Sequence, residues 1–122
     1  MKEILIDVTE RDILNAISLL RGNKGRVSQS CNCPIAIAAT RALGRKCSAA
    51  GHHVILWKNN QEMEVGYLAP SEMLQFIRSF DSVVHRDEKQ YPEDFPKPFS
   101  FTAKFSHTIF PLDKPLTLAD DI

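Results

Sequence analysis

The segment from Pro34 to Gly44 constrains the fold most, because its residues are small and both of its ends are marked. It has the sequence Pro-Ile-Ala-Ile-Ala-Ala-Thr-Arg-Ala-Leu-Gly. Alanine has the highest helix propensity, proline is favoured in the first helical position, and glycine commonly ends a helix. We therefore expect a helix over residues 34–44. Small side chains allow close packing, so we expect this helix to be buried on one side.

The chain before this segment predicts a strand and then an amphipathic helix. Residues 2–8 are apolar and β-branched, which favours a strand. Thr9 and Asp12 have the spacing of a shortened capping box. Apolar residues then recur with helical spacing over residues 10–21. Residues 22–31 are polar and contain two glycines, which predicts a loop between the two helices.

The second half of the chain predicts a hairpin, a third helix and a final strand. Residues 52–58 and 62–68 have strand patterns and are joined by an Asn-Asn-Gln turn. Pro70 begins a third amphipathic helix. A charged loop insert over residues 82–97 follows. Phenylalanines at every second position then predict a strand over residues 98–105 with one buried face.

The order β-α-α-β-β-α-β predicts an α+β fold, in which helices cover one face of a mostly antiparallel sheet. A chain of 122 residues is long enough to bury one core. We expect a single globular domain over residues 1–105 and a C-terminal tail over residues 106–122. The sequence has no run of about 18 apolar residues and no signal peptide, so we expect a cytoplasmic protein without a membrane span.

The cysteines Cys31, Cys33 and Cys47 are few and odd in number, which favours reduced thiols. Cys33 immediately precedes a predicted helix, where a thiol can become nucleophilic. The three cysteines with His52 or His53 offer metal ligands, but the Cys-x-Cys spacing is poor for zinc. The alternative is that the thiols pack as small apolar groups. We predict no catalytic residue, no metal ligand and no cofactor.

Charge is unevenly distributed along the chain. Lys plus Arg equals Asp plus Glu at 15 each, which argues against a general nucleic-acid binder. Residues 13–61, however, contain seven basic residues and no acidic one. This excess favours a site for an anion such as a phosphate. The alternative is that these charges lie on different faces of the molecule.

The polar loop and the helix that begins at Pro34 form the strongest candidate site, because helix N-termini bind phosphates. Basic residues in and after the loop supply charge, short polar residues supply hydrogen bonds, and two hairpin aromatics can stack on a base. The alternative is an ordinary exposed loop with the aromatics in the core. The predicted ligand-binding residues are Arg21, Lys24, Arg26, Ser30, Asn32, Arg45, Trp57 and Tyr67.

Three motifs carry a resemblance to a known group of proteins. They are Ile6-Asp7-Val8-Thr9, Asn32-Cys33-Pro34-Ile35-Ala36-Ile37-Ala38, and Phe76-Ile77-Arg78-Ser79-Phe80-Asp81 with Pro98-Phe99-Ser100-Phe101. In this order they resemble small proteins of bacteriophage and prophage genomes that have no assigned activity. The resemblance covers residues 4–105, and this chain departs from it in the insert over residues 82–97 and in the tail. It implies a phage accessory protein in the bacterial cytoplasm.

Phage proteins of this size often antagonise host defence. We therefore expect a non-enzymatic protein that binds a phosphorylated small molecule, such as a nucleotide signal. One alternative is a protein-interaction module that inhibits a host enzyme or complex, with the insert and the tail as contact regions. Another is a thiol- or metal-dependent enzyme. Nucleic acid and membrane are not expected as partners, whereas a homodimer is compatible with a chain of this size.

Overall fold

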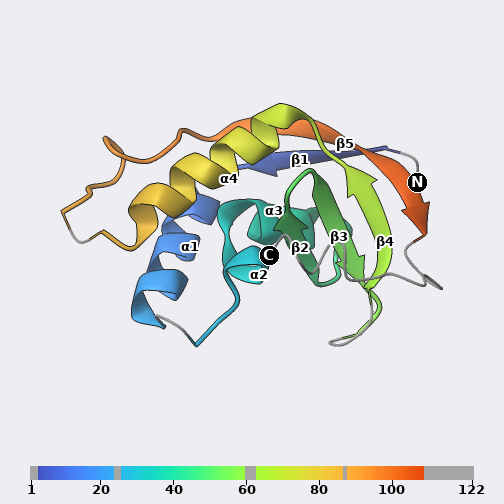
Figure 1. Cartoon of the computed structure of the whole chain (residues 1–122), viewed down its shortest axis with the longest axis horizontal. Coiled ribbons are helices and arrows are strands. Elements are labelled where there is room, and N and C mark those ends of the chain that lie inside the picture. The colour runs from blue at the N-terminus through green and yellow to red at the C-terminus, as the bar shows by residue number, and fades with distance from the viewer. Residues whose placement is uncertain (1–2, 24–25, 60–62, 87, 109–122) are drawn as a thin grey trace.

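The computed structural model describes residues 3–23, 26–59, 63–86 and 88–108 (Figure 1). In chain order, the elements are β1 (Glu3–Val8), α1 (Glu10–Gly22), α2 (Gln29–Asn32), α3 (Pro34–Leu43), β2 (Cys47–Ala50), β3 (His53–Trp57), β4 (Met63–Leu68), α4 (Ser71–Val84) and β5 (Phe99–Thr108). The predicted α+β class and element order are confirmed. The structure adds α2, most of which lies in the predicted loop over residues 22–31, and β2, for which the sequence predicts no element.

The strands form one antiparallel sheet in the order β1-β5-β4-β3-β2. Its N-terminal strand follows the period of two that a half-buried strand requires, because Ile4, Ile6 and Val8 are buried and the residues between them are exposed. Ile6 pairs with Phe101 on β5, which continues the same buried face. The sheet curls, and β1 and β2 are its two edge strands (Figure 1).

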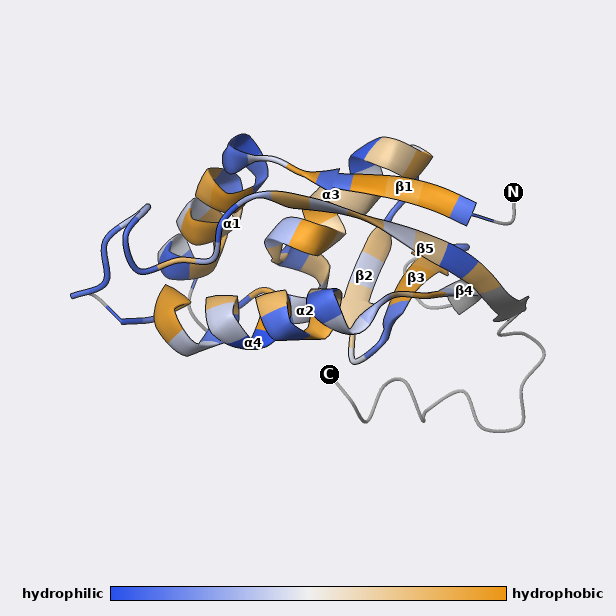
Figure 2. Ribbon diagram, turned by 90° about the horizontal axis from the view of Figure 1, so that it is seen from above, coloured by the Kyte–Doolittle hydropathy of each residue, from blue (hydrophilic) through white to orange (hydrophobic). Residues whose placement is uncertain are grey.

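Helix α3 lies inside the curl and packs against both edge strands (Figure 1). Its alanines at positions 36, 38 and 39 are almost completely buried. Because these side chains are single methyl groups, the helix backbone can approach both edges of the sheet. The prediction that this helix is buried on one side is confirmed, because Arg41 and Ala42 on its other side are exposed. In Figure 2, α3 and β1 are mostly in the apolar colours, whereas α1 and α4 alternate between apolar and polar segments.

The C-terminal half of α3 also binds the edge strands through polar side chains. The backbone N–H of Cys47 on β2 donates to Thr40 Oγ1 at 3.1 Å. Arg41 Nη2 donates to the carbonyl oxygen of Asp7 on β1 at 2.8 Å. The helix ends at Gly44, whose φ of +72° lies in the left-handed region and whose N–H donates to Thr40 O. Neighbouring residues on one helix therefore hold opposite edges of the sheet.

Buried Asp12 joins α1 to α3. The predicted capping box is confirmed, because Thr9 N donates to Asp12 Oδ2 at 2.9 Å and Asp12 N donates to Thr9 Oγ1 at 3.2 Å. Arg41 donates to both carboxylate oxygens of Asp12. Burial alone would raise the pKa of Asp12, but the hydrogen bonds from Arg41 and Thr9 outweigh it and lower the pKa below 3.8.

Aromatic rings join α4 to β5 and to the segment between them. Phe76 stacks on Phe99 with ring centroids 5.0 Å apart, and Phe80 contacts Phe95 at 5.8 Å. Helix α4 continues to Val84, so the first residues of the predicted insert are helical. The rest of that segment is held against the core through Phe95, which is buried.

We expect α3 to tolerate enlargement only on its exposed side. Ala39→Leu should lower the free energy of unfolding by about 1–3 kcal/mol, because Ala39 is fully buried and the added atoms must displace the packed side chains around it. Ala42→Leu on the exposed side of the same helix is the matched control and should change it by no more than about 0.5 kcal/mol. Urea unfolding of the three proteins measures both effects. Equal midpoints for the two variants would contradict the burial of one side of α3.

We expect Asp12 to contribute to the acid sensitivity of the fold. A lowered folded-state pKa adds stability above the unfolded-state pKa, and this stability is lost as pH falls through the folded-state value. Asp12→Asn should lower the unfolding free energy at pH 7 by about 2–4 kcal/mol and should flatten its decline below pH 4. Urea titrations from pH 7 to pH 2 measure this. Glu72→Gln, at an exposed residue of α4, is the control and should retain the wild-type profile.

Candidate functional site

The predicted ligand-binding residues lie in several separate places. Arg21 lies in the last turn of α1 and binds the end of α4 and the chain after it. Its Nε donates to Val84 O at 2.6 Å, and its Nη2 donates to Arg86 O at 2.9 Å and Lys89 O at 3.2 Å. Its guanidinium also lies 5.5 Å from the Phe95 ring centroid. The donors of Arg21 are therefore used in fastening the segment after α4 to α1.

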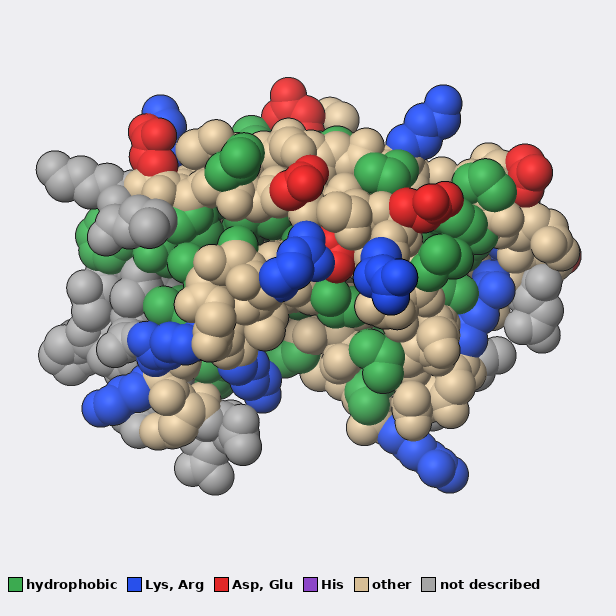
Figure 3. Space-filling model, turned by 180° about the vertical axis from the view of Figure 1, so that it is seen from behind, with side chains coloured by type: hydrophobic (Ala, Val, Ile, Leu, Met, Phe, Trp, Pro, Cys, Tyr) green, Lys and Arg blue, Asp and Glu red, His purple; other side chains and the backbone are tan. Residues whose placement is uncertain are grey.

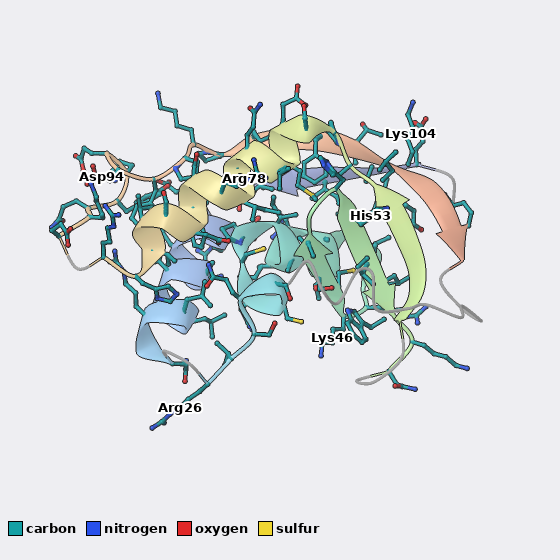
Figure 4. All side chains as sticks on the ribbon, viewed as in Figure 1. Arg26, Lys46, His53, Arg78, Asp94 and Lys104 are labelled. Carbon is teal, nitrogen blue, oxygen red and sulfur yellow. The ribbon has the colours of Figure 1, made fainter. Side chains whose placement is uncertain are left out.

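The polar loop contributes unequally. Lys24 lies outside the described residues. Arg26 is exposed and projects outward into solvent from the lower side of the molecule (Figure 4). Asn32 Nδ2 donates to Ser28 O at 2.7 Å, and the buried Ser30 hydroxyl lies 3.0 Å from the Ser28 hydroxyl. The two short polar residues thus make bonds within the turn that leads into α3.

The two hairpin aromatics have different surroundings. Arg45 Nη2 donates to Trp57 O at 2.9 Å, and Trp57 Nε1 donates to Ser48 Oγ at 3.0 Å. Lys46, which was not among the predicted site residues, places its Nζ 5.6 Å from the Trp57 ring centroid. Tyr67 is buried and meets Phe105 edge to face at 6.1 Å. The structure therefore brings Arg45 and Trp57 together, whereas Tyr67 belongs to the core.

The acid-free segment gives one side of the molecule a basic character. Arg26 and Lys46 point outward from the same lower side (Figure 4). From behind, acidic side chains lie in the upper and central parts of the face, and its lower part carries Lys and Arg side chains (Figure 3). A hollow of about 420 Å³ on this side is lined by Cys31, Ile37, Thr40, Gly44, Arg45, Lys46 and Cys47. It lies at the C-terminal end of α3, where the helix dipole is negative and opposes an anion.

A larger cleft, of about 560 Å³, lies between α2, the turn joining β2 to β3, and α4. Its size is within the usual range for small-molecule sites. Ser30 is the one predicted site residue that lines it. The other lining residues are Gln29, Cys33, Ala49, Ala50, Gly51, His52, Leu74, Ile77, Arg78 and Asp81. We call this space the α2–α4 cleft.

Helix α4 gives the cleft a wall with two kinds of surface. Leu74 and Ile77 are half-buried and apolar. Arg78 is exposed on the same helix (Figure 4), and within the described part of the chain its guanidinium has no hydrogen-bond or ion-pair partner. Asp81 completes a stripe with helical spacing. An apolar surface therefore lies beside an unpaired positive charge.

Gln29 fixes the opposite, polar part of the cleft. Its Nε2 donates to Asp81 Oδ1, and its Oε1 lies 3.2 Å from His85 Nε2. The amide thus bridges α2 to α4. The protein desolvates the Asp81 carboxylate and so raises its pKa above 3.8, while the Gln29 hydrogen bond and the nearby His85 oppose this rise.

Cys33 lies at the predicted N-cap position of α3, but burial there opposes ionisation of its thiol. Burial raises the pKa of the Cys33 thiol to about 11, although the nearby backbone N–H groups of Ala36 and Ile35 act in the opposite direction. Burial likewise raises the pKa of Cys47 to about 11. Within the described residues, no three His, Cys, Asp or Glu side chains are placed to hold a metal ion.

No protein-family model, curated protein or solved structure matches the chain. Among the described residues, no helix combines the length and apolar character needed to cross a bilayer.

We expect the three thiols to react at different rates. Cys31 is half-buried and should react quickly with a disulfide reagent, whereas Cys33 and Cys47 should react at least a hundredfold more slowly. With a pKa of about 11, a thiol is only about one part in a thousand ionised at pH 8. Absorbance after addition of dithiobis(nitrobenzoate) measures the rates. Denaturant should make all three equivalent, and a fast phase lost in Cys33→Ser would contradict this assignment.

Proposed function

We propose that the protein is a non-enzymatic binder of a phosphorylated small molecule, with nucleotides as the favoured class, and that the ligand occupies the α2–α4 cleft. The observation that carries the proposal is the Arg78 guanidinium at the edge of this cleft, which has no hydrogen-bond or ion-pair partner among the described residues. Arginine presents a rigid fork of N–H donors that matches two oxygens of a phosphate. An arginine that no described side chain or carbonyl engages, beside a ligand-sized space, supports anion binding there.

The orientation of α3 supports the same location. Cys33, the N-cap of α3, lines the cleft, so the positive end of the helix dipole lies at its wall. The other hollow lies at the negative end of the same helix. His52, an exposed residue of the β2–β3 turn, is a further donor on the cleft rim. The basic side of the molecule would then attract the anion, and the cleft would hold it.

The apolar part of the wall supports a ligand with a flat ring. Leu74 and Ile77 lie one turn from Arg78 and Asp81 on α4, so a base on the two aliphatic side chains leaves its phosphate near Arg78. The buried Cys33 thiol, with its high pKa, supports binding without covalent chemistry. A role in the host cytoplasm as a phage protein that sequesters a nucleotide signal is part of this proposal, on the strength of the motif resemblance.

The alternative of a protein-interaction module stays a prediction. It depends on the insert over residues 82–97 and on the tail. Arg21 and Phe95 tie much of the insert to the core. The tail from residue 109 onward lies outside the described residues.

We expect Arg78→Ala to weaken binding of nucleoside 5′-monophosphates at least tenfold, because it removes the unpaired cation from the cleft. Isothermal titration calorimetry at low salt with guanosine, adenosine and inosine monophosphates measures the affinities. Arg26→Ala is the matched control: this arginine is exposed, lies outside the cleft and should leave affinity within twofold of wild type.

Each outcome of this comparison has a distinct meaning. Loss of affinity in Arg45→Ala but not in Arg78→Ala would move the site to the basic side of the molecule. Wild-type protein that binds none of the three nucleotides at millimolar concentration would overturn the proposed function. Circular dichroism melting curves verify that each variant is folded.

A further inference from the structure

We infer that the α2–α4 cleft selects a guanine base, and that Asp81 is the residue that recognises it. This inference rests on the proposed function and concerns the specificity of the same site. It follows from the order of groups along α4, from the hydrogen bond that fixes Asp81, and from the pattern of donors on the purine bases.

Asp81 lies beside Arg78 in the wall of the cleft. Leu74, Ile77, Arg78 and Asp81 are spaced by three and four residues, so they share one face of α4, and all four line the cleft. Arg78 and Asp81 are neighbours on that face, and both are exposed. A ligand held by Arg78 through a phosphate therefore meets a carboxylate with another part of its structure. A second phosphate would be repelled there, whereas a donor-bearing ring would be bound.

A hydrogen bond from Gln29 orients the Asp81 carboxylate. Gln29 Nε2 donates to Asp81 Oδ1, while Gln29 Oε1 faces His85 Nε2 at 3.2 Å. The amide is thus held at both ends, and it holds one oxygen of Asp81 in place. Oδ2 makes no hydrogen bond among the described residues. An ionised carboxylate only accepts hydrogen bonds and has about four acceptor positions, so it retains capacity for two donors from a ligand.

The purine bases differ in the hydrogen-bond donors that they can offer to a carboxylate. Guanine carries two adjacent donors, the N1–H and the N2 amine, and a carboxylate accepts from both in a bidentate arrangement. Hypoxanthine lacks the amine. Adenine places an acceptor, N1, next to its single amine, and that acceptor would face the carboxylate oxygen. Guanine is therefore the common base that satisfies Asp81 at both positions, while its ring contacts Leu74 and Ile77.

A titration of wild-type protein with matched monophosphates tests the inference directly. We expect guanosine monophosphate to bind at least tenfold more tightly than inosine or adenosine monophosphate, because only guanine offers both donors. This comparison needs no substitution and so does not depend on the folding of a variant. Binding of all three with affinities within twofold, and weakened by Arg78→Ala, would overturn the guanine inference and leave the proposed function standing.

The variant Asp81→Asn tests the role of Asp81 itself. An amide accepts one hydrogen bond and donates another, so it matches xanthine, which has N1–H beside a carbonyl oxygen. We expect Asp81→Asn to lose at least tenfold in affinity for guanosine monophosphate and to gain at least tenfold for xanthosine monophosphate. Asp94→Asn, at an exposed residue outside the cleft (Figure 4), should retain the wild-type preference.

The outcomes are distinguishable. Gain for xanthosine monophosphate cannot come from a merely structural role, because a damaged cleft would lose both ligands. Loss of both ligands in a folded Asp81→Asn protein, or no change in either, would overturn the role of Asp81. Wild-type protein that binds no nucleotide at all would overturn the proposed function and this inference with it.

Discussion

The packing of α3 between the two edge strands is the contact on which the rest of the structure depends. A sheet whose first and last strands both touch one helix must curl around it, and it can do so only if that helix is thin (Figure 1). Buried alanines at positions 36, 38 and 39 provide this. Thr40 and Arg41 then hold the two edges through hydrogen bonds, which also blunts strand edges that would otherwise be free to pair with other chains.

The hydrogen bonds made by α3 also help to position the candidate site. Arg41 bonds Asp7 on β1 and the buried Asp12 on α1, so one guanidinium sets the position of α1 relative to the sheet. Arg21, at the far end of α1, fastens the segment that follows α4. The wall of the cleft is therefore positioned by a chain of charge-assisted hydrogen bonds that begins at α3. Such bonds are directional, so they fix the placement of α4 more closely than apolar contact alone would.

Much of the fold could be predicted from the sequence because long, periodic segments carry local signals. Thr9 with Asp12 marked a helix start, and Gly44 marked a helix end. Strand β2 was missed because its four residues, Cys-Ser-Ala-Ala, are all buried and show no alternation. The site was harder to predict, because the number of charged residues in a segment does not show which groups each side chain contacts in the folded protein. Arg21 donates its hydrogen bonds to backbone carbonyls, and Tyr67 is buried in the core. The cleft combines residues from α2, the β2–β3 turn and α4, and only tertiary packing brings these together.

The uneven charge of the sequence gains a physical meaning once the two ends of α3 are compared. The basic residues at its C-terminal end, Arg45 and Lys46, neutralise the negative end of the helix dipole, and the stacking of Lys46 on Trp57 uses this charge locally. At the N-terminal end, the dipole is positive, and Arg78, which has no partner in the described part of the chain, adds to it. The segment with the most basic residues is therefore not the place where positive potential is left for a ligand. In the proposed function that place is the α2–α4 cleft, where Asp81 would limit the positive region to the side of Arg78 and leave the other side for hydrogen-bond donors.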